Sequence, residues 1–218
     1  NNIDSLQSLI CQYPDQIACV VLEPAAIECP AVGDKISGCC GLAVCDRNYK
    51  MAGENYLQQV QDLCNKNGII FVLDEMITGF RWHMKGAQYL YNVKPDISTF
   101  GKAMANGFSV ACVAGRREIM EMGSIEQQGR ERMFLLSTTQ CAEMSSRGAF
   151  VATVNCMQKH DVVGHIWEYG QRLMDILQRQ AVAHEISDSF KVGGIACSPY
   201  YFTLDHFGQN SMALRTLF

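Results

Sequence analysis

Two short strand-like runs, each followed closely by a charged residue, most constrain what this chain can fold into. The first is Ile69-Ile70-Phe71-Val72-Leu73, which stops at Asp74. Five consecutive apolar residues, several of them β-branched, predict a strand buried on both faces, as in a parallel sheet. The second run, Ile97–Phe100, leads into Gly101 and Lys102. We therefore expect a carboxylate and an amine at the ends of two strands.

The segment between these two runs is long enough for one crossover connection, which two parallel strands require. The carboxyl ends of parallel strands meet at one edge of an open α/β sheet, where such sheets bind ligands. Asp74 and Lys102 are therefore predicted to face one crevice.

The pattern around these strands favours an α/β domain. Another apolar run, 17–22, predicts a buried strand that ends at Glu23-Pro24. Apolar residues recur at helical spacing over 54–67 and 162–183, and a further long helix is predicted over 142–158. The glycine-rich stretch 25–53 shows no sustained period and predicts a long loop.

Beyond Ser189 the helical pattern gives way to a weakly alternating, strand-like run over 200–204. We therefore expect two domains, with residues 1–189 in part of a large domain and residues 190–218 at the beginning of a small one. A length of 218 residues suits one filled α/β domain and part of a second.

Composition argues against several other classes of protein. The net charge of -4, with no basic cluster, is unfavourable for binding nucleic acid. No apolar run approaches about 20 residues, so we expect no membrane span. The first residues, Asn1-Asn2-Ile3-Asp4, do not resemble a signal peptide, and a cytoplasmic location is predicted.

Eleven cysteines raise the alternatives of disulfides and zinc. The number is odd, and Cys19, Cys112 and Cys156 lie inside apolar runs, so we expect reduced thiols in the core. Cys39-Cys40 and Cys45 are clustered without the four-ligand spacing of a structural zinc site and with no histidine nearby. We predict no metal there, and the role of that cluster stays open.

The chemistry follows from Asp74 and Lys102 as a pair. Taken singly, a lysine is most often a surface group and an aspartate at a strand end is most often a cap. A lysine flanked by Gly101 and Ala103 is, however, accessible to a carbonyl compound, and partial burial would make it a usable nucleophile. Pyridoxal 5'-phosphate (PLP) requires a lysine for a Schiff base and an acid at its pyridine nitrogen.

Three blocks of the sequence, in order, resemble the class III aminotransferases. They are Glu23-Pro24, the Asp-Glu…Thr-Gly-Phe-Arg block of 73–81, and the Pro-Asp…Gly-Lys block of 94–102. This subgroup of the fold-type I PLP enzymes includes ω-aminotransferases and glutamate-1-semialdehyde aminomutase. The resemblance implies a large α/β domain, with a mostly parallel sheet and helices on both faces, followed by a small α+β domain. Because that family has roughly twice this length, the chain is expected to be a central fragment.

The resemblance also implies roles for individual residues. Lys102 is similar to the Schiff-base lysine and Asp74 to the partner of the pyridine nitrogen. Met76 stands where the family usually has valine against the ring, and filling the core is its alternative role. Thr139, with Thr138 as the adjacent alternative, matches the threonine that contacts the phosphate across a homodimer interface. Capping the following helix is the other role for Thr138.

Glu28 stands at the second glutamate of the family's Glu-Pro-x-x-x-Glu stretch, which pairs with a substrate-binding arginine, and a solvated loop acid is the alternative. Ala26 and the stretch 106–109 depart from the family pattern, so substrate preference stays open. The implied function is transfer of an amino group between an amine or amino acid and a keto or aldehyde acceptor through Lys102. An intramolecular aminomutase and a non-catalytic fragment of the fold are the alternatives.

Overall fold

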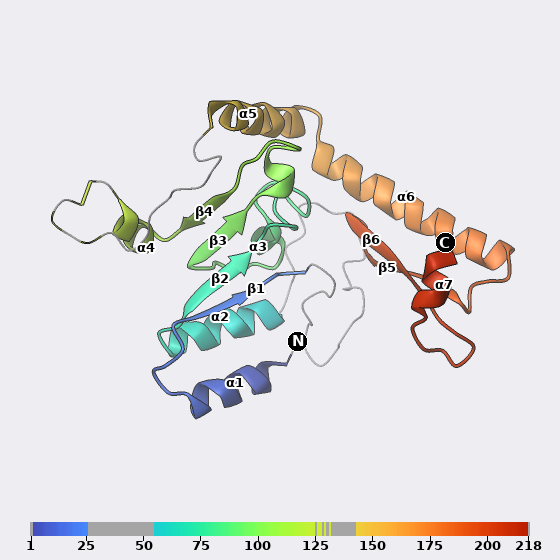
Figure 1. Cartoon of the computed structure of the whole chain (residues 1–218), viewed down its shortest axis with the longest axis horizontal. Coiled ribbons are helices and arrows are strands. Elements are labelled where there is room, and N and C mark those ends of the chain that lie inside the picture. The colour runs from blue at the N-terminus through green and yellow to red at the C-terminus, as the bar shows by residue number, and fades with distance from the viewer. Residues whose placement is uncertain are drawn as a thin grey trace.

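A four-stranded sheet carries the residues on which the sequence prediction depends (Figure 1). The computed structural model describes residues 2–25, 55–124, 126–127, 129, 131 and 143–217. Within them the sheet has the order β1-β2-β3-β4. Its strands are β1 (Cys19–Leu22), β2 (Ile70–Asp74), β3 (Ile97–Phe100) and β4 (Cys112–Gly115). The first three are parallel and β4 is antiparallel to β3, so the predicted α/β class and mostly parallel sheet are confirmed.

The register of β2 and β3 brings the two charged strand ends to the same edge. Leu73 pairs with Ser98 and Asp74 pairs with Thr99. Lys102 comes shortly after Thr99, just past the end of β3. The prediction that a single crossover joins these strands in parallel is confirmed.

Two helices stack on one another beside β2. The helix α2 (Tyr56–Lys66) packs on β2, and α1 (Ile3–Gln12) packs on α2 (Figure 1). The buried face of α2 carries Leu57, Val60 and Cys64 at helical spacing. The predicted helix over 54–67 is confirmed.

The C-terminal part holds two longer helices and a separate two-stranded sheet. The helices α5 (Met144–Lys159) and α6 (Val162–Ala183) fall where the sequence predicts them. The sheet pairs β5 (Phe190–Ile195) with β6 (Ser198–Thr203) in antiparallel fashion, and α7 (Met212–Leu217) follows. The strand β5 was not predicted, because it contains Gly193-Gly194, a pair that interrupts the apolar alternation. The shorter elements are α3 (Ala87–Leu90), η1 (Lys102–Met104), α4 (Arg117–Met120) and η2 (Glu121–Gly123).

Burial in the sheet differs from the prediction. In β2, Phe71 and Leu73 are fully buried, but Ile70, Val72 and Asp74 are only partly covered. In β1, Cys19 and Val21 share one face and are exposed, Val21 to 60%, so the described residues leave that face uncovered. The expectation of strands buried on both faces was therefore wrong for the described residues.

The cysteine prediction is also partly wrong. Cys19, on the edge strand β1, and Cys156, on α5, are exposed, and Cys112 is partly buried. All three are free thiols, as expected, but they are not core residues. Cys39, Cys40 and Cys45 lie outside the described residues.

Candidate functional site

Asp74 ends β2 with one carboxylate oxygen already engaged. Its Oδ1 accepts a hydrogen bond from the backbone N–H of Met76, at 2.9 Å, and another from the hydroxyl of Thr99, at 3.0 Å. From the described residues, Oδ2 receives no hydrogen bond. The side chain is only partly buried. Asp74 is thus held through one oxygen and can offer the other to a ligand.

Lys102 begins the η1 turn, just past the end of β3. Its backbone has φ +45°, in the left-handed region that is unfavourable for a residue with a side chain. The turn is closed by the N–H of Met104, which donates to the carbonyl of Gly101 at 3.0 Å. The Lys102 side chain is exposed, so the expected partial burial is not observed.

A side chain at the residue before this lysine would displace Met76. A Cβ on Gly101 would lie 2.5 Å from Cε and 3.0 Å from Sδ of Met76. The thioether of Met76 therefore lies against the backbone that delivers Lys102, while its own N–H holds Asp74. Met76 contacts both strand ends.

Glu75, next in sequence to Asp74, is a structural acid. Its side chain is fully buried and accepts hydrogen bonds from the Thr78 hydroxyl and from the backbone N–H groups of Ala87 and Gln88, each of the latter at 2.8 Å. Burial raises the pKa of Glu75, although these hydrogen bonds lower it. Glu75 binds the first turn of α3 to the end of β2, so it fixes the loop that follows Asp74.

Two other motif residues, Phe80 and Asp96, have structural contacts. The ring of Phe80 contacts the rings of Phe100 and Phe150 edge-on, with centroids 5.9 and 6.2 Å apart. Asp96 accepts from the N–H of Phe71 at 2.8 Å and from the Arg116 guanidinium at 2.9 Å. These contacts join β2, β3 and the end of β4, so the acid of the Pro-Asp block is structural as well.

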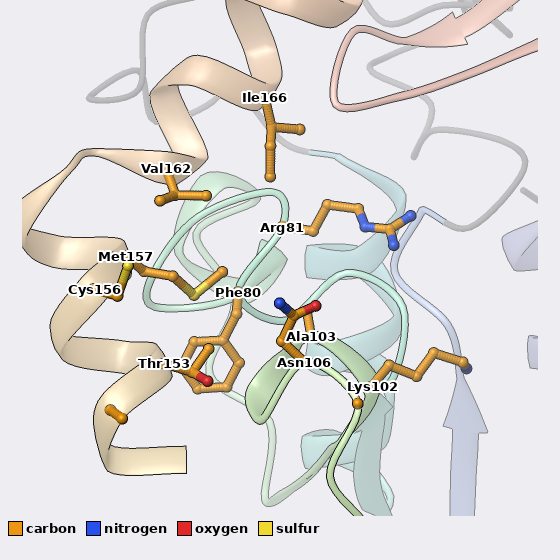
Figure 2. Close-up of a pocket in the computed structure, with 12 residues that line it drawn as sticks. Phe80, Arg81, Lys102, Ala103, Asn106, Thr153, Cys156, Met157, Val162 and Ile166 are labelled. Atoms are coloured by element: carbon orange, nitrogen blue, oxygen red, sulfur yellow. The ribbon is translucent and has the colours of Figure 1, made fainter. Parts of the chain in front are cut away.

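A cavity of about 630 Å³ lies between the Lys102 turn and the two long helices. Figure 2 shows the Lys102 and Arg81 side chains extending away from Thr153, Cys156 and Met157 of α5. The lining residues are Phe80, Arg81, Lys102, Ala103, Asn106, Gly107, Ala152, Thr153, Cys156, Met157, Val162 and Ile166. Sequence reasoning missed this cavity, because nothing local indicates that α5 approaches η1.

The structure brings together Asp74, Met76 and the backbone of Lys102. Glu28, Thr138 and Thr139 lie outside the described residues. Thr99 and Glu75 were missed as site residues. A hydroxyl one strand away from a predicted acid, in parallel register, was the signal that could have identified Thr99.

No cluster of three or more metal-ligating side chains occurs in the described part of the chain. The helices described there include none with the length and apolar character that a bilayer crossing requires.

Most of the chain is similar in sequence to known proteins. Residues 46–199 match the family model of the class-III aminotransferases. The chain is 31% identical over 206 residues to glutamate-1-semialdehyde 2,1-aminomutase 2 of Lachnoclostridium phytofermentans, which covers 90% of this chain and 41% of that protein. It is 36% identical over 133 residues to the aminomutase of Caldicellulosiruptor bescii, covering 59% and 27%. The chain thus spans less than half the length of these relatives.

Solved structures share the fold at lower identity. An aminotransferase from Bacillus anthracis superposes with a TM-score of 0.71 at 18% identity, covering 99% of this chain and 44% of that one. An ω-transaminase from Thermomicrobium roseum gives a TM-score of 0.70 at 20% identity, covering 93% and 40%. The described architecture is therefore that of fold-type I transaminases.

Proposed function

The chain belongs to the class-III aminotransferase family, and on that premise we propose that it forms the cofactor-binding part of a PLP-dependent aminotransferase. The protein transfers an amino group from an amine or amino acid to a keto or aldehyde acceptor. One observation carries the proposal: Asp74, anchored through Oδ1, and Lys102 stand at the same edge of two adjacent parallel strands.

The residues present fit PLP. Asp74 Oδ2, without a donor among the described residues, suits the N–H of a pyridinium ring. The Lys102 amine is exposed one strand away and can reach a carbonyl carbon. The thioether of Met76 offers a soft apolar contact between them. These residues would hold the cofactor, with Lys102 and Asp74 as the catalytic pair.

When bound, PLP supplies an electron sink for the bond that breaks at the substrate carbon. Lys102 would hold the cofactor through Nζ. The same Nζ would serve as the general base and acid that accepts and returns the proton at the substrate carbon bearing the amino group. Asp74 would hold the proton on the ring nitrogen.

The remaining predictions complete this proposal. Thr139, or the adjacent Thr138, binds the cofactor phosphate of the partner subunit in a homodimer, and Glu28 borders the substrate. The division into a large domain over 1–189 and a small domain from 190 onward, and a cytoplasmic location, belong to the same proposal. Analytical ultracentrifugation of the full-length protein tests the dimer, since a monomer that still binds PLP would contradict the shared site.

An intramolecular aminomutase is the second candidate, because the relatives at 31 and 36% identity carry that name. An aminomutase needs no separate keto acceptor, so turnover with and without an added keto acid separates the two reactions. A non-catalytic fragment is the third reading, and the presence of both Asp74 and Lys102 argues against it.

The experiment that tests the proposal is Lys102→Ala in the full-length protein. Borohydride reduction of the wild-type protein with bound PLP should attach the cofactor irreversibly to Lys102, which peptide mass spectrometry can locate. The variant should lose both this adduct and the visible absorbance of covalently bound cofactor. Lys94→Ala removes an exposed lysine of the same Pro-Asp block and should change neither. An adduct on another lysine, or none in the wild type, would overturn the proposal.

A further inference from the structure

We infer that Thr99 is a positioning residue for Asp74, and that its hydroxyl directs the free carboxylate oxygen of Asp74 toward the cofactor ring nitrogen. This inference rests on the proposed function and adds a residue that no motif of the sequence singled out. The observation behind it is a hydrogen bond between neighbouring strands, from Thr99 Oγ1 to Asp74 Oδ1 at 3.0 Å.

Two donors from different segments meet on one oxygen of Asp74. The Thr99 hydroxyl comes from β3, and the Met76 N–H comes from the turn after β2, at 2.9 Å. A carboxylate held by a single donor can still rotate about its Cβ–Cγ bond. Two donors on Oδ1 restrict that rotation, and Oδ2 is left as the oxygen available to a ligand. Hydrogen bonds to a charged acceptor are stronger than neutral ones, so each donor contributes appreciably.

Threonine suits this role because its side chain is short and restricted. A β-branched residue has few favourable χ1 rotamers, so the hydroxyl of Thr99 is pre-oriented on its strand. The backbone is fixed as well, since the carbonyl of Thr99 accepts from the N–H of Glu75 at 3.0 Å. Thr99 therefore contacts the end of β2 twice, once through its side chain and once through its backbone.

The two contacts can be separated by substitution. Thr99→Val keeps the β-branched shape, the strand propensity and the backbone bond to Glu75, and it removes only the hydroxyl. Thr99→Ser keeps the hydroxyl. Ser98→Ala is the matched control, because it removes a hydroxyl from the adjacent residue of β3 that bonds Gln88 at 3.3 Å and not Asp74.

The test measures cofactor affinity in the full-length apoprotein with two ligands, PLP and 1-deazapyridoxal phosphate, in which carbon replaces the ring nitrogen. Thr99→Val should weaken PLP binding about three- to tenfold, the size expected when the net contribution of one ordinary hydrogen bond is lost. The deaza compound cannot bind Asp74 through that position, so its affinity should change by less than about twofold. Thr99→Ser and Ser98→Ala should leave both affinities close to wild type.

Each other outcome is decisive. An equal loss for both ligands in Thr99→Val would mean that Thr99 only supports the local fold, and unchanged affinity for both would mean that its hydroxyl does not act on Asp74. Either result overturns the inference and leaves the proposed function standing. A wild-type protein that binds neither ligand would overturn the proposed function, and the inference with it.

Discussion

Asp74 and Glu75 are adjacent acids in one motif, but their surroundings give them different roles. Asp74 is partly buried and has one oxygen without a donor from the described residues, whereas Glu75 is fully buried and accepts three hydrogen bonds. Successive side chains along a strand point to opposite faces of the sheet, and the face on which Glu75 lies is the enclosed one. The same residue pattern therefore separates a candidate ligand-binding group from a structural one.

The raised pKa of Glu75 predicts a pH-dependent stability. Because burial raises this pKa above the ordinary value of 4.5, the folded state binds the proton more tightly than the unfolded chain. The stability contributed by this group is complete below 4.5 and is lost as the pH rises through the folded pKa.

Glu75→Gln removes that ionisation, and it sets an amide NH₂ against the N–H groups of Ala87 and Gln88. The variant should be less stable than wild type at acidic pH, and the difference should narrow as the pH rises. Urea unfolding between about pH 4 and about pH 8 measures this difference. A difference that stayed constant or widened would contradict the assignment.

At the scale of the element, α2 shows how a helix start can also fix a neighbouring loop. Asn55 and Gln58 form a capping box, in which each side chain accepts from the other's backbone N–H, at 3.2 and 3.0 Å. The Asn55 side chain also donates to the carbonyl of Tyr91 at 2.9 Å. One buried residue thus begins α2 and holds the end of α3.

Asn55→Ala should cost about 2–3 kcal/mol of unfolding free energy, since it removes a cap and leaves the buried Tyr91 carbonyl without that donor. Asn2→Ala is the matched control. Asn2 caps α1 through one exposed bond to the Ser5 N–H at 3.0 Å, and its loss should cost about 1 kcal/mol or less. Chemical denaturation of both variants measures the two costs. Equal costs would show that the Tyr91 contact adds nothing.

At the scale of the molecule, α6 joins the C-terminal hairpin to the rest of the chain. The indole N–H of Trp167 donates to the carbonyl of Trp82 at 3.0 Å, and both rings are buried. Three residues along the helix, a Cβ on Gly170 would lie 1.7 Å from the carbonyl oxygen of Ala196, between β5 and β6. Within about one turn, α6 therefore contacts both the loop after β2 and the β5–β6 hairpin.

A glycine-to-alanine substitution at each of two helical positions tests the close approach of α6 to the hairpin. Gly170→Ala should destabilise the protein by about 1–3 kcal/mol, because the added methyl overlaps backbone that cannot move freely. Gly148→Ala lies in α5, where the new Cβ has no neighbour within 4 Å, so it should stabilise by up to about 1 kcal/mol through helix propensity. Thermal unfolding compares the two. Stabilisation by both would mean that α6 and the hairpin are not in contact.

Prediction from sequence succeeded where the signal is local and failed where it depends on a neighbour. The strand-like runs before Asp74 and Lys102 identify both strands, and the crossover length predicts their parallel pairing. The exposure of Val21 depends on what packs on that face of β1, which the residues of the strand do not encode. The strand β5 was missed because Gly193-Gly194 has no apolar alternation, although β6 supplies the pairing that makes it a strand.

The sequence by itself determined the α/β class, the two charged strand ends and the resemblance to an enzyme family, because hydrophobic periodicity and motif spacing are properties of consecutive residues. The tertiary structure alone decided that Thr99 holds Asp74, that Glu75 holds α3 and that Gly170 meets Ala196. Those contacts join residues from different elements, and their geometry is set by strand register and helix packing. Strand register and helix packing both depend on residues that are distant in sequence, so no single stretch of the chain determines them.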